Sequence, residues 1–376
     1  MAGFDAIVCG LGGMGSAAAA ELARRGQRVL GLERHHAVHD LGSSHGGSRI
    51  IRQAYFEGEE YVPLLLRAYE RWAQVERDSG RELLTITGGL MLGGPDSETV
   101  SGALASARKF NLEHEELDSA ELRRRFPTLR IRDEVGVYEP LAGFVSPEAS
   151  VAVHLALAER AGADLRFTES VRSWMPTRSG GVAVTTDHGR YEADRLVVTA
   201  GAWSSEVLAD LALPLTVERQ IQFWFAPPGG VEPFSAAGHP VYIWELADGT
   251  QFYGLPQHGP ASDGVKVAFF RMGGPTSPET VDRQVHPEEV AQTRSVVTEL
   301  VPGLDGPLVR AATCLYTTTP DEDFLITAHP EHPQVVLATG FSGHGFKFVS
   351  VVGEILADLA IDGSTTLPIE LFRLRW

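Results

Sequence analysis

Two glycine-rich loops, one near each end of this 376-residue chain, have the residue types and spacing to hold a phosphate-bearing ligand. The first is Gly10-Leu-Gly12-Gly13-Met14-Gly15, which follows an apolar run and precedes an alanine-rich stretch of helical composition. In this spacing the glycines allow a tight turn, a close backbone approach to a pyrophosphate and close packing of helix on strand. The start of the helix offers unpaired N–H groups to phosphate oxygens. The loop therefore predicts a dinucleotide site.

An acidic residue, Glu33, ends the next predicted strand at 28–33. A carboxylate in this position accepts hydrogen bonds from both hydroxyls of an adenosine ribose and repels a 2′-phosphate, which favours NAD or FAD over NADP. The alternative is a solvated strand end. Cys9, inside the first strand, is predicted to be a small buried packing residue rather than a reactive thiol.

The second loop, Gly340-Phe-Ser-Gly343-His344-Gly345-Phe346-Lys347, lies between an apolar strand at 335–339 and a helical apolar repeat at 348–359. An NAD enzyme needs one such loop for its pyrophosphate, whereas a flavin must also have its ring held. A helix N-terminus directed at the N1/C2=O edge stabilises negative charge in the reduced ring. The pair of loops favours FAD over NAD, and a plain glycine turn is the alternative.

Cationic side chains next to these loops are suited to an anionic substrate. In Gly42-Ser43-Ser-His45-Gly-Gly-Ser48-Arg49-Ile50-Ile-Arg52, the two arginines are three residues apart and would share one face of a helix. One guanidinium can clamp a carboxylate in bidentate fashion, and another near a flavin can stack or stabilise negative charge. Solvated arginines on a surface helix, and a solvated helix start at Lys347, are the alternatives.

Length and composition limit the function classes. The 376 residues, 43% of them hydrophobic, are typical of a well-buried globule of two domains. Two cysteines provide no disulfide framework, and the N-terminus lacks the pattern of a secretion signal, which predicts a cytoplasmic protein. A formal charge of −17 argues against binding to nucleic acids or anionic membranes. No apolar stretch approaches the roughly 20 residues that span a bilayer.

The predicted elements interleave as if one domain were threaded through another. Helices are expected at 61–75 and 151–161, a strand with a Gly-Gly break at 84–92, and a buried strand that enters a small-residue turn at 191–203. Short aromatic-rich runs separated by Pro and Gly predict antiparallel strands at 220–225, 241–246, 251–255 and 265–272. The predicted class is α/β (α+β, two domains). A Rossmann-like FAD-binding domain comprises 1–85, 147–212 and 311–376, and a substrate domain on a mainly antiparallel sheet comprises 86–146 and 213–310.

Six segments, in order along the chain, carry a resemblance to a known family: His45–Tyr55 with Glu60–Pro63, Gly201-Ala-Trp203, Tyr253-Gly-x-Pro256, Cys314-Leu-Tyr316-Thr, Pro320-Asp-Glu-Asp-Phe, and the second glycine loop. The sequence resembles the monomeric sarcosine oxidase and N-methyltryptophan oxidase family of flavoproteins, which is related to pipecolate oxidases and fructosyl-amine oxidases. The resemblance covers nearly the whole chain.

The resemblance implies that Cys314 carries the flavin through a thioether to its 8-methyl carbon, a bond that a thiolate can form with an oxidised flavin. It also implies that Lys266 lies over the flavin and promotes its reaction with oxygen, since a buried cation there stabilises superoxide-like charge. From the residues alone, Cys314 could be a buried packing residue and Lys266 an edge-strand lysine that points to water.

By the same resemblance, Arg52 and Lys347 bind the substrate carboxylate, Arg49 lies beside the flavin, and Tyr253 and Tyr316 line the amine pocket. The expected cofactor contacts are Gly10, Gly12, Gly13, Met14, Gly15, Glu33, Arg34, Gly42, Ser43, His45, Ser48, Arg49, Ile50, Val171, Ala200, Gly201, Trp203, Cys314, Gly343, His344, Gly345, Phe346 and Lys347, with no metal.

The implied reaction is hydride transfer from the N-alkyl carbon of a secondary amino acid to flavin N5, hydrolysis of the imine, and reoxidation by O2 to give H2O2. The expected protein is a monomer. Alternatives are a flavin dehydrogenase that uses a protein or quinone acceptor, an oxidase of a bulkier amine (pipecolate, N-methyltryptophan or a fructosyl amino acid), and a non-catalytic flavin-fold binding protein.

Two positions depart from the family pattern. Phe270 stands where the pattern has a histidine four residues after the oxygen lysine, and Trp244 stands where it has a methionine nine residues before the pocket tyrosine. A more aromatic pocket would suit a bulkier or cyclic N-alkyl group. Core packing is the alternative, because a shift of one residue turns a strand side chain to the other face.

Overall fold

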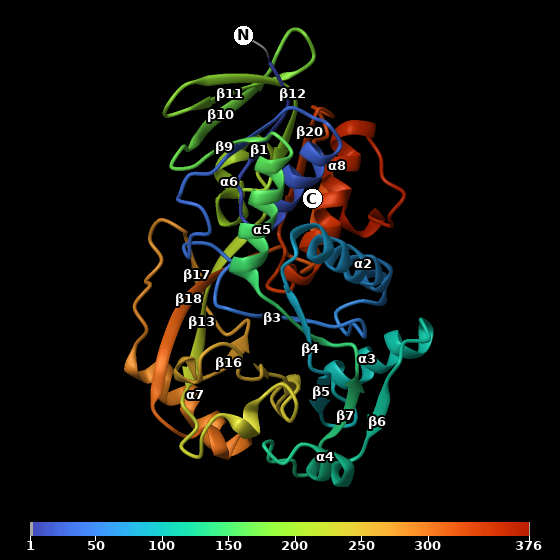
Figure 1. The fold of residues 1–376 in the computed structure, drawn as a ribbon, viewed down its shortest axis with the longest axis vertical. Helices are drawn as coiled ribbons and strands as arrows, with labels where there is room; N and C mark the ends of the chain where they lie inside the picture. The colour runs from blue at the N-terminus through green and yellow to red at the C-terminus, as the bar shows by residue number, and fades with distance from the viewer. Residues whose placement is uncertain (1–2, 376) are drawn as a thin grey trace.

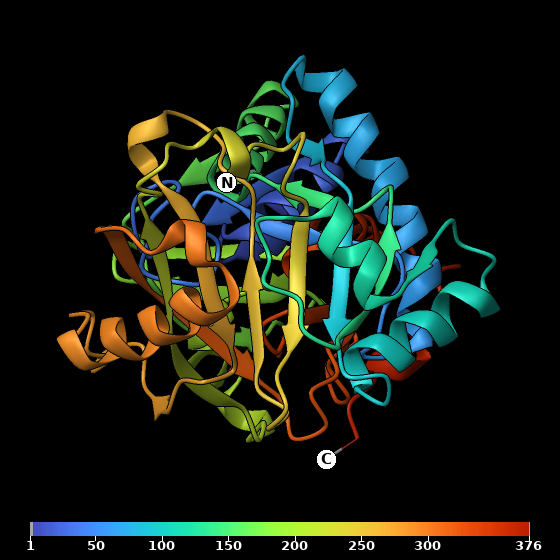
Figure 2. The same ribbon diagram turned by 90° about the horizontal axis from the view of Figure 1, so that it is seen from below.

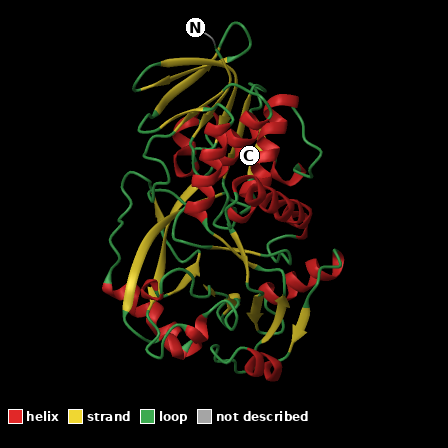
Figure 3. Cartoon of the chain, viewed as in Figure 1, coloured by secondary structure: helices red, strands yellow, loops and turns green. Residues whose placement is uncertain are grey.

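The computed structural model describes residues 3–375, which form three β-sheets and the helices that cover them. A sheet with parallel strands at its centre, together with the helices that cover it, occupies the upper half of Figure 1. A second, mainly antiparallel sheet occupies the lower half. Figure 3 shows the same division, with helices concentrated around the upper sheet and at the margins of the lower one.

The upper sheet is parallel at its centre, where β1 pairs with β2 and β12, β2 with β9, and β12 with β20. Parallel strands are buried on both faces and so are apolar throughout, as the buried run Ala6–Cys9 illustrates. Antiparallel strands extend the sheet on one side. Its members are β1 (Phe4–Cys9), β2 (Val29–Leu32), β9 (Asp164–Arg166), β10 (Val171–Pro176), β11 (Val182–Thr186), β12 (Arg190–Val198), β19 (Leu325–Ala328) and β20 (Val335–Thr339).

The lower sheet is antiparallel except where β14 pairs with β5. Figure 2, seen from below, shows its strands side by side beneath the upper body. The sheet confirms the predicted mainly antiparallel architecture. Its strand order is β17-β13-β16-β15-β14-β5-β7-β6, and β18 pairs with β13. The members are β5 (Gly89–Gly93), β6 (Glu115–Leu117), β7 (Val135–Glu139), β13 (Thr216–Phe225), β14 (Val241–Glu245), β15 (Gln251–Gly254), β16 (Val265–Phe270), β17 (Pro275–Thr276) and β18 (Leu308–Thr318).

A small third sheet, β3 (Arg49–Ile51), β8 (Gly143–Val145) and β4 (Leu84–Ile86), joins the two halves. The prediction that Arg49 and Arg52 share one face of a helix is wrong, because the segment pairs with β8 as an antiparallel strand. The β-branched pair Ile50 and Ile51 fits a strand better than a helix.

The helices are α1 (Gly13–Arg24), α2 (Val62–Ser79), α3 (Glu98–Lys109), α4 (Ser119–Arg125), α5 (Pro147–Arg160), α6 (Ser204–Val207), α7 (Pro287–Leu300) and α8 (Val349–Asp362). The helices predicted at 61–75, 151–161 and 348–359 correspond to α2, α5 and α8. The strand predicted at 84–92 is two strands, β4 and β5, in different sheets. Among residues 3–375, no helix combines the length and the apolar character needed to cross a membrane.

Contacts between helices explain how the upper body closes. Helix α1 packs against both α5 and α8, so that elements from the two ends of the chain lie side by side. Gly353 of α8 approaches the backbone of Ala17 in α1 so closely that an added Cβ would lie 2.8 Å from its carbonyl carbon. This close packing holds the starts of α1 and α8 at the same edge of the sheet.

Candidate active site

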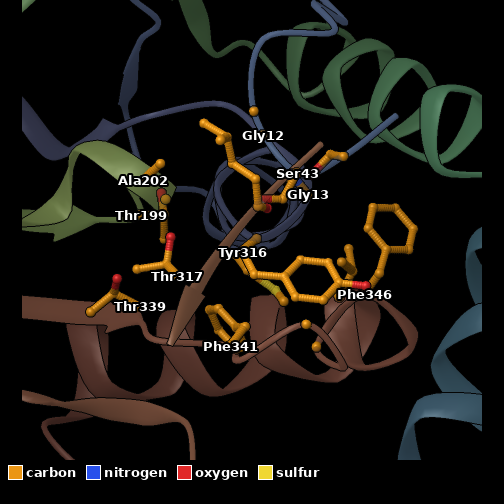
Figure 4. A pocket seen from close by; sticks show the side chains of 18 of the residues that line it. Gly12, Gly13, Ser43, Thr199, Ala202, Tyr316, Thr317, Thr339, Phe341 and Phe346 are labelled. Atoms are coloured by element: carbon orange, nitrogen blue, oxygen red, sulfur yellow. Dashed lines mark hydrogen bonds between the residues drawn. The ribbon is translucent and has the colours of Figure 1, made fainter. Parts of the chain in front are cut away.

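A cavity lies at the carboxyl ends of β1 and β20 and extends to the lower sheet. In Figure 4, Thr199, Thr317 and Thr339 lie on one side of this cavity and Phe346 on the other, with the ring of Tyr316 between them. The residues of the predicted site that line it are Gly10, Gly12, Gly13, Met14, Glu33, Arg34, Gly42, Ser43, Ser48, Arg49, Ile50, Arg52, Val171, Ala200, Gly201, Trp203, Tyr253, Phe270, Tyr316, Gly343, His344, Gly345, Phe346 and Lys347.

Five predicted residues do not line the cavity. Gly15, His45, Lys266 and Cys314 are buried directly behind its wall, whereas Trp244 belongs to the core of the lower sheet. Gly15 has a packing role, because a Cβ on this residue would lie 1.7 Å from the carbonyl oxygen of Gly10. Only glycine therefore allows α1 to begin this close to β1.

The carboxylate of Glu33 is buried in the wall of the cavity, with 5% of the residue exposed. One oxygen accepts from the backbone N–H of Leu11 at 2.8 Å and the other from that of His35 at 3.0 Å. Burial opposes ionisation, but His39 and these N–H groups outweigh it and lower the pKa of Glu33. Glu33 is thus a held, charged acceptor and not a solvated strand end.

The second glycine loop connects β20 to α8 through a short 3₁₀ turn at Phe346–Phe348. Its Gly343 has φ +84°, and a Cβ there would lie 2.4 Å from the ring of Tyr316. The backbone of the loop therefore lies directly against a ring from β18. The loop lines the cavity and lies against the first glycine loop, because a Cβ on Gly13 would be 3.1 Å from the ring of Phe346, so its role goes beyond that of a plain turn.

Two buried cations, Arg52 and Lys347, line the cavity. Arg52 is 1% exposed, donates to the carbonyl of Ala54 at 2.7 Å and forms an ion pair with Glu57. Lys347 donates to the carbonyl of His344 at 2.8 Å. Neither cation is a solvated surface group, so the solvated alternatives for Arg52 and Lys347 are wrong.

The charges of this cluster depend on one another. Burial and the charge of Arg52 lower the pKa of Lys347 to about 7, although Glu57 opposes the shift. Burial opposes ionisation of Glu57, but its positive neighbours, Arg52 foremost, lower its pKa to about 2. Burial also lowers the pKa of His344 to about 3. Near neutral pH, Glu57 is charged, His344 is neutral, and Lys347 is close to its midpoint.

Glu57 is a site residue that the sequence reasoning missed. It lines the cavity and contacts the very arginine that was expected to hold a substrate carboxylate. The available signal was an acidic residue in the segment directly after Arg52, among the aromatic residues Tyr55 and Phe56. An arginine that is to be buried needs an anionic partner nearby.

Cys314 differs from Cys9 in its electrostatic surroundings. Burial raises the pKa of the Cys9 thiol to about 12. For Cys314 burial acts in the same direction, but His45 and Arg49 outweigh it and lower the pKa to about 7. The sulfur of Cys314 lies 3.6 Å from an Arg49 nitrogen. Of the two cysteines, Cys314 is therefore the one with access to the thiolate, the reactive form.

Lys266 lies in β16, between β13 and β15 in the interior of the lower sheet. It is 1% exposed, and its Nζ donates to the carbonyls of Gly46 at 2.9 Å and Ser48 at 2.7 Å. Burial, together with the charge of Arg49, lowers its pKa well below the usual value. The alternative of an edge-strand lysine in water is wrong.

The register of the lower sheet decides which residues face the cavity. Ile243 lies opposite Tyr253, and Trp244 lies opposite Phe252 on the other face. Both Ile243 and Tyr253 line the cavity, whereas Trp244 is 1% exposed in the core. Trp244 is thus misplaced by one residue in the sequence reasoning, and Ile243 takes its place at the cavity wall.

The other departure from the family pattern, Phe270, does line the cavity, and its ring lies 5.9 Å from that of Tyr316. Further along this wall are two residues that were not predicted, Gln251 and Phe56. The wall beside Tyr253 and Tyr316 is therefore mainly aromatic and aliphatic.

Unpaired polar atoms in the wall of the cavity indicate that a bound group belongs there. Within residues 3–375, the buried atoms Ser48 Oγ and Thr317 Oγ1, both from residues that line the cavity, have no hydrogen-bond partner. Buried polar groups are almost always paired, so these atoms call for a polar ligand. Glu33, the start of α1 and the second loop all line this cavity, and they are the groups that suit the ribose, the pyrophosphate and the ring of FAD.

Comparison with known proteins identifies the class. The family model described as "FAD dependent oxidoreductase" matches residues 5–359, and the chain belongs to this family. Within it, the chain belongs to the group of monomeric sarcosine oxidases and N-methyl-L-tryptophan oxidases.

Two relatives and one solved structure illustrate the similarity. The chain is 55% identical over 371 residues to the monomeric sarcosine oxidase of Streptomyces avermitilis, which covers 98% of this chain and 96% of that one. It is 34% identical over 377 residues to the N-methyl-L-tryptophan oxidase of Escherichia coli K12, which covers 99% and 98%. The open form of NikD, an unusual amino acid oxidase essential for nikkomycin biosynthesis, matches with a TM-score of 0.87 and 27% identity over 100% and 98%. The predicted family, fold class and FAD cofactor are confirmed.

Proposed function

We propose that this chain is an FAD-dependent oxidase of secondary N-methyl or cyclic amino acids. The observation that carries the proposal is the buried pair Arg52 and Lys347 in the wall of a cavity that suits FAD. Bound FAD supplies the acceptor for a hydride from the carbon next to the amine nitrogen, and a route for both electrons to O2, which becomes H2O2. Water then hydrolyses the resulting imine.

Arg52 and Lys347 bind the substrate carboxylate, and they fix the substrate by one end. Arg52 offers a planar fork that matches a carboxylate, whereas Lys347 acts as a point charge. Glu57 already neutralises Arg52, so an incoming carboxylate competes with it. This competition makes the charge on Lys347 decisive for binding.

The opposite end of the substrate faces Ile243, Tyr253, Phe270 and Tyr316. Burial raises the pKa of both tyrosines, which therefore remain neutral hydrogen-bonding groups. An apolar wall of this kind disfavours a charged amine and favours the uncharged form, whose lone pair assists loss of the hydride. Positioning and deprotonation of the substrate by its environment are the main contributions of the chain.

Cys314 forms the covalent link to the flavin. His45 and Arg49 stabilise its thiolate, the form that would hold the flavin through a thioether to the 8-methyl carbon. Formation of this thioether would leave the bound ring two electrons reduced, and O2 would be the oxidant that restores it. Acid precipitation tests the link: yellow chromophore stays in the pellet of the parent protein and is found in the supernatant of Cys314→Ser. Chromophore in the supernatant of both would overturn the assignment.

Lys266 promotes the reaction with oxygen. Its amine is buried, and burial, together with the charge of Arg49, lowers its pKa well below the usual value. A charged amine at this position would stabilise the negative charge that develops on O2 as it accepts an electron. An oxidase is therefore favoured over a dehydrogenase that uses a protein or quinone acceptor.

Oxygen uptake with sarcosine, N-methylalanine, N-methyltryptophan, proline and pipecolate tests the substrate class. Uptake with at least one of these, matched by anaerobic bleaching of the flavin, is the expected result. Bleaching and dye reduction without oxygen uptake would identify a dehydrogenase, and no bleaching with any of them would exclude this substrate class. Because Phe270 makes the cavity wall more aromatic, we expect a bulkier or cyclic N-alkyl group to be turned over better than that of sarcosine. The monomeric state and cytoplasmic location stay predictions, the first testable by light scattering.

A further inference from the structure

Three non-glycine residues with a left-handed backbone conformation lie close together beside the cavity. Within residues 3–375, seven non-glycine residues have a positive φ, and they include Arg271 at 56°, Glu322 at 64° and Ser342 at 47°. This conformation is uncommon and costs energy for a residue with a Cβ, so surrounding contacts must maintain it. Strained backbone of this kind clusters at functional sites, where backbone groups must point in a set direction.

The guanidinium of Arg271 connects these residues. Its Nε and Nη2 donate to the carbonyl oxygen of Ser342 at 3.3 and 3.0 Å, and its Nη1 forms an ion pair with Glu322. The carbonyl of Glu322 in turn lies 3.2 Å from Nε2 of His344. One arginine thus joins the end of β16, the turn between β18 and β19, and the second glycine loop.

Because the peptide unit is planar, the hydrogen bonds from Arg271 to the Ser342 carbonyl also fix the direction in which the Gly343 N–H points. The Ser342–Gly343 peptide is trans, so the N–H of Gly343 points away from the carbonyl that Arg271 holds. Ser342 and Gly343 line the cavity, whereas Arg271 does not. Within the described residues, the Gly343 N–H has no backbone or side-chain acceptor, unlike the neighbouring N–H of Ser342, which donates to Thr317.

We propose that Arg271 is a positioning residue for the cofactor: from outside the cavity it fixes and polarises the Ser342–Gly343 peptide, so that the Gly343 N–H donates to the part of FAD that becomes negative on reduction. The inference rests on the proposed placement of the FAD ring at the second glycine loop. A charge-assisted bond to a peptide carbonyl strengthens the donor at the other end of the peptide. A donor held in place before the reaction stabilises developing charge most effectively.

The test compares purified holoenzymes of the parent, Arg271→Gln, Arg271→Lys and Glu322→Gln. Two measurements report on the stability of negative charge on the ring: the two-electron reduction potential, and the affinity for sulfite, which adds reversibly to oxidised flavins. For Arg271→Gln we expect sulfite to bind about tenfold more weakly and the potential to fall by about 30 mV, the equivalent of tenfold for two electrons. Arg271→Lys keeps the positive charge but loses the planar guanidinium. Its potential and sulfite affinity should therefore lie between those of the parent and those of Arg271→Gln.

Glu322→Gln is the matched control, because it breaks the ion pair but leaves the bonds from Arg271 to Ser342. The potential of this variant should stay level or rise, since a negative charge is removed. The proposal is overturned if Arg271→Gln keeps the parent's potential and sulfite affinity within twofold, or if Glu322→Gln lowers both equally. A higher KM with an unchanged potential would instead show that Arg271 binds substrate. Where Arg271→Gln yields no holoenzyme, Arg271→Lys decides on the same two measurements.

Neither measurement needs an amine substrate. If the chain oxidises another class of substrate, the proposed function fails while the effect of Arg271 on potential and sulfite affinity remains. If the substrate class is right and Arg271 is inert, the panel of amines is oxidised and both flavin measurements stay level. The two proposals can therefore fail separately.

Discussion

The pKa of Lys347 predicts how binding of a carboxylate depends on pH. Burial and Arg52 lower this pKa from 10.5 to about 7, so the ammonium loses its proton within the range in which the protein can be assayed. The neighbouring groups do not titrate there: Glu57 has a pKa of about 2 and His344 of about 3. A substrate analogue without an ionisable amine, such as methoxyacetate, should therefore report on Lys347 without a contribution from Glu57 or His344.

The magnitude follows from the fraction of charged lysine. If the carboxylate binds only when Lys347 is protonated, the apparent Kd increases by the inverse of that fraction. With a pKa of about 7, about half of the molecules are competent near pH 7 and about one in a hundred near pH 9, so Kd should rise about 50-fold. Below about pH 6 it should level off, because Lys347 is then fully charged.

Titration of the flavin absorbance with methoxyacetate, at constant ionic strength from about pH 6 to about pH 9, measures this curve. Lys347→Met should bind weakly and show no inflection. Glu57→Gln should move the inflection below pH 7, because the charge of Glu57 raises the pKa of Lys347. A flat curve for the parent, or the same 50-fold rise in Lys347→Met, would refute the reasoning that Lys347 is the titrating group.

Four further substitutions follow from the geometry. Lys266→Met should slow reoxidation of the reduced enzyme by O2 by about a hundredfold in stopped-flow experiments and anaerobic reduction far less; an equal loss in both would contradict the assignment. Ile243→Ala removes bulk from the cavity wall, so it should raise the ratio of kcat/KM for N-methyltryptophan over kcat/KM for sarcosine about tenfold. Trp244→Phe changes the core instead, so it should lower the free energy of unfolding by about 1–3 kcal/mol and leave that ratio within twofold. Gly15→Ala places a Cβ 1.7 Å from the carbonyl oxygen of Gly10, so it should yield protein without flavin by absorbance; normal FAD content would contradict the packing argument.

Local patterns in the sequence predicted the glycine-rich parts of the cavity wall. Both glycine loops and Glu33 belong to strand–loop–helix units. The pattern of such a unit lies within a short stretch of sequence, so the positions of these residues could be predicted. The spacing of Arg49 and Arg52 is different, since three residues fit a helix turn as well as a short strand. Pairing with β8, a strand nearly a hundred residues further along the chain, decides between them.

Long-range pairing also explains the other differences. The side of β14 that faces the cavity depends on its register with β15, which periodicity alone leaves open to a shift of one residue. Trp244 and Ile243 exchange roles for that reason. The burial of Lys266 follows from the position of β16 between two other strands, and the pairing of Glu57 with Arg52 from the path of a loop. No local signal encodes such neighbours.

The adjacency of β1, β12 and β20 has a consequence for biosynthesis. Strand β12 at the centre of the sheet pairs with the first strand of the chain and with the last, and α1 packs on α8. A ribosome makes the chain from its N-terminus. More than three hundred residues are therefore synthesised between the first glycine loop and the second. Closing so long a loop is slow, and exposed apolar strands such as β1 invite aggregation in the meantime. FAD, which gains its full set of contacts only after this closure, can then act as the ligand that locks the finished sheet.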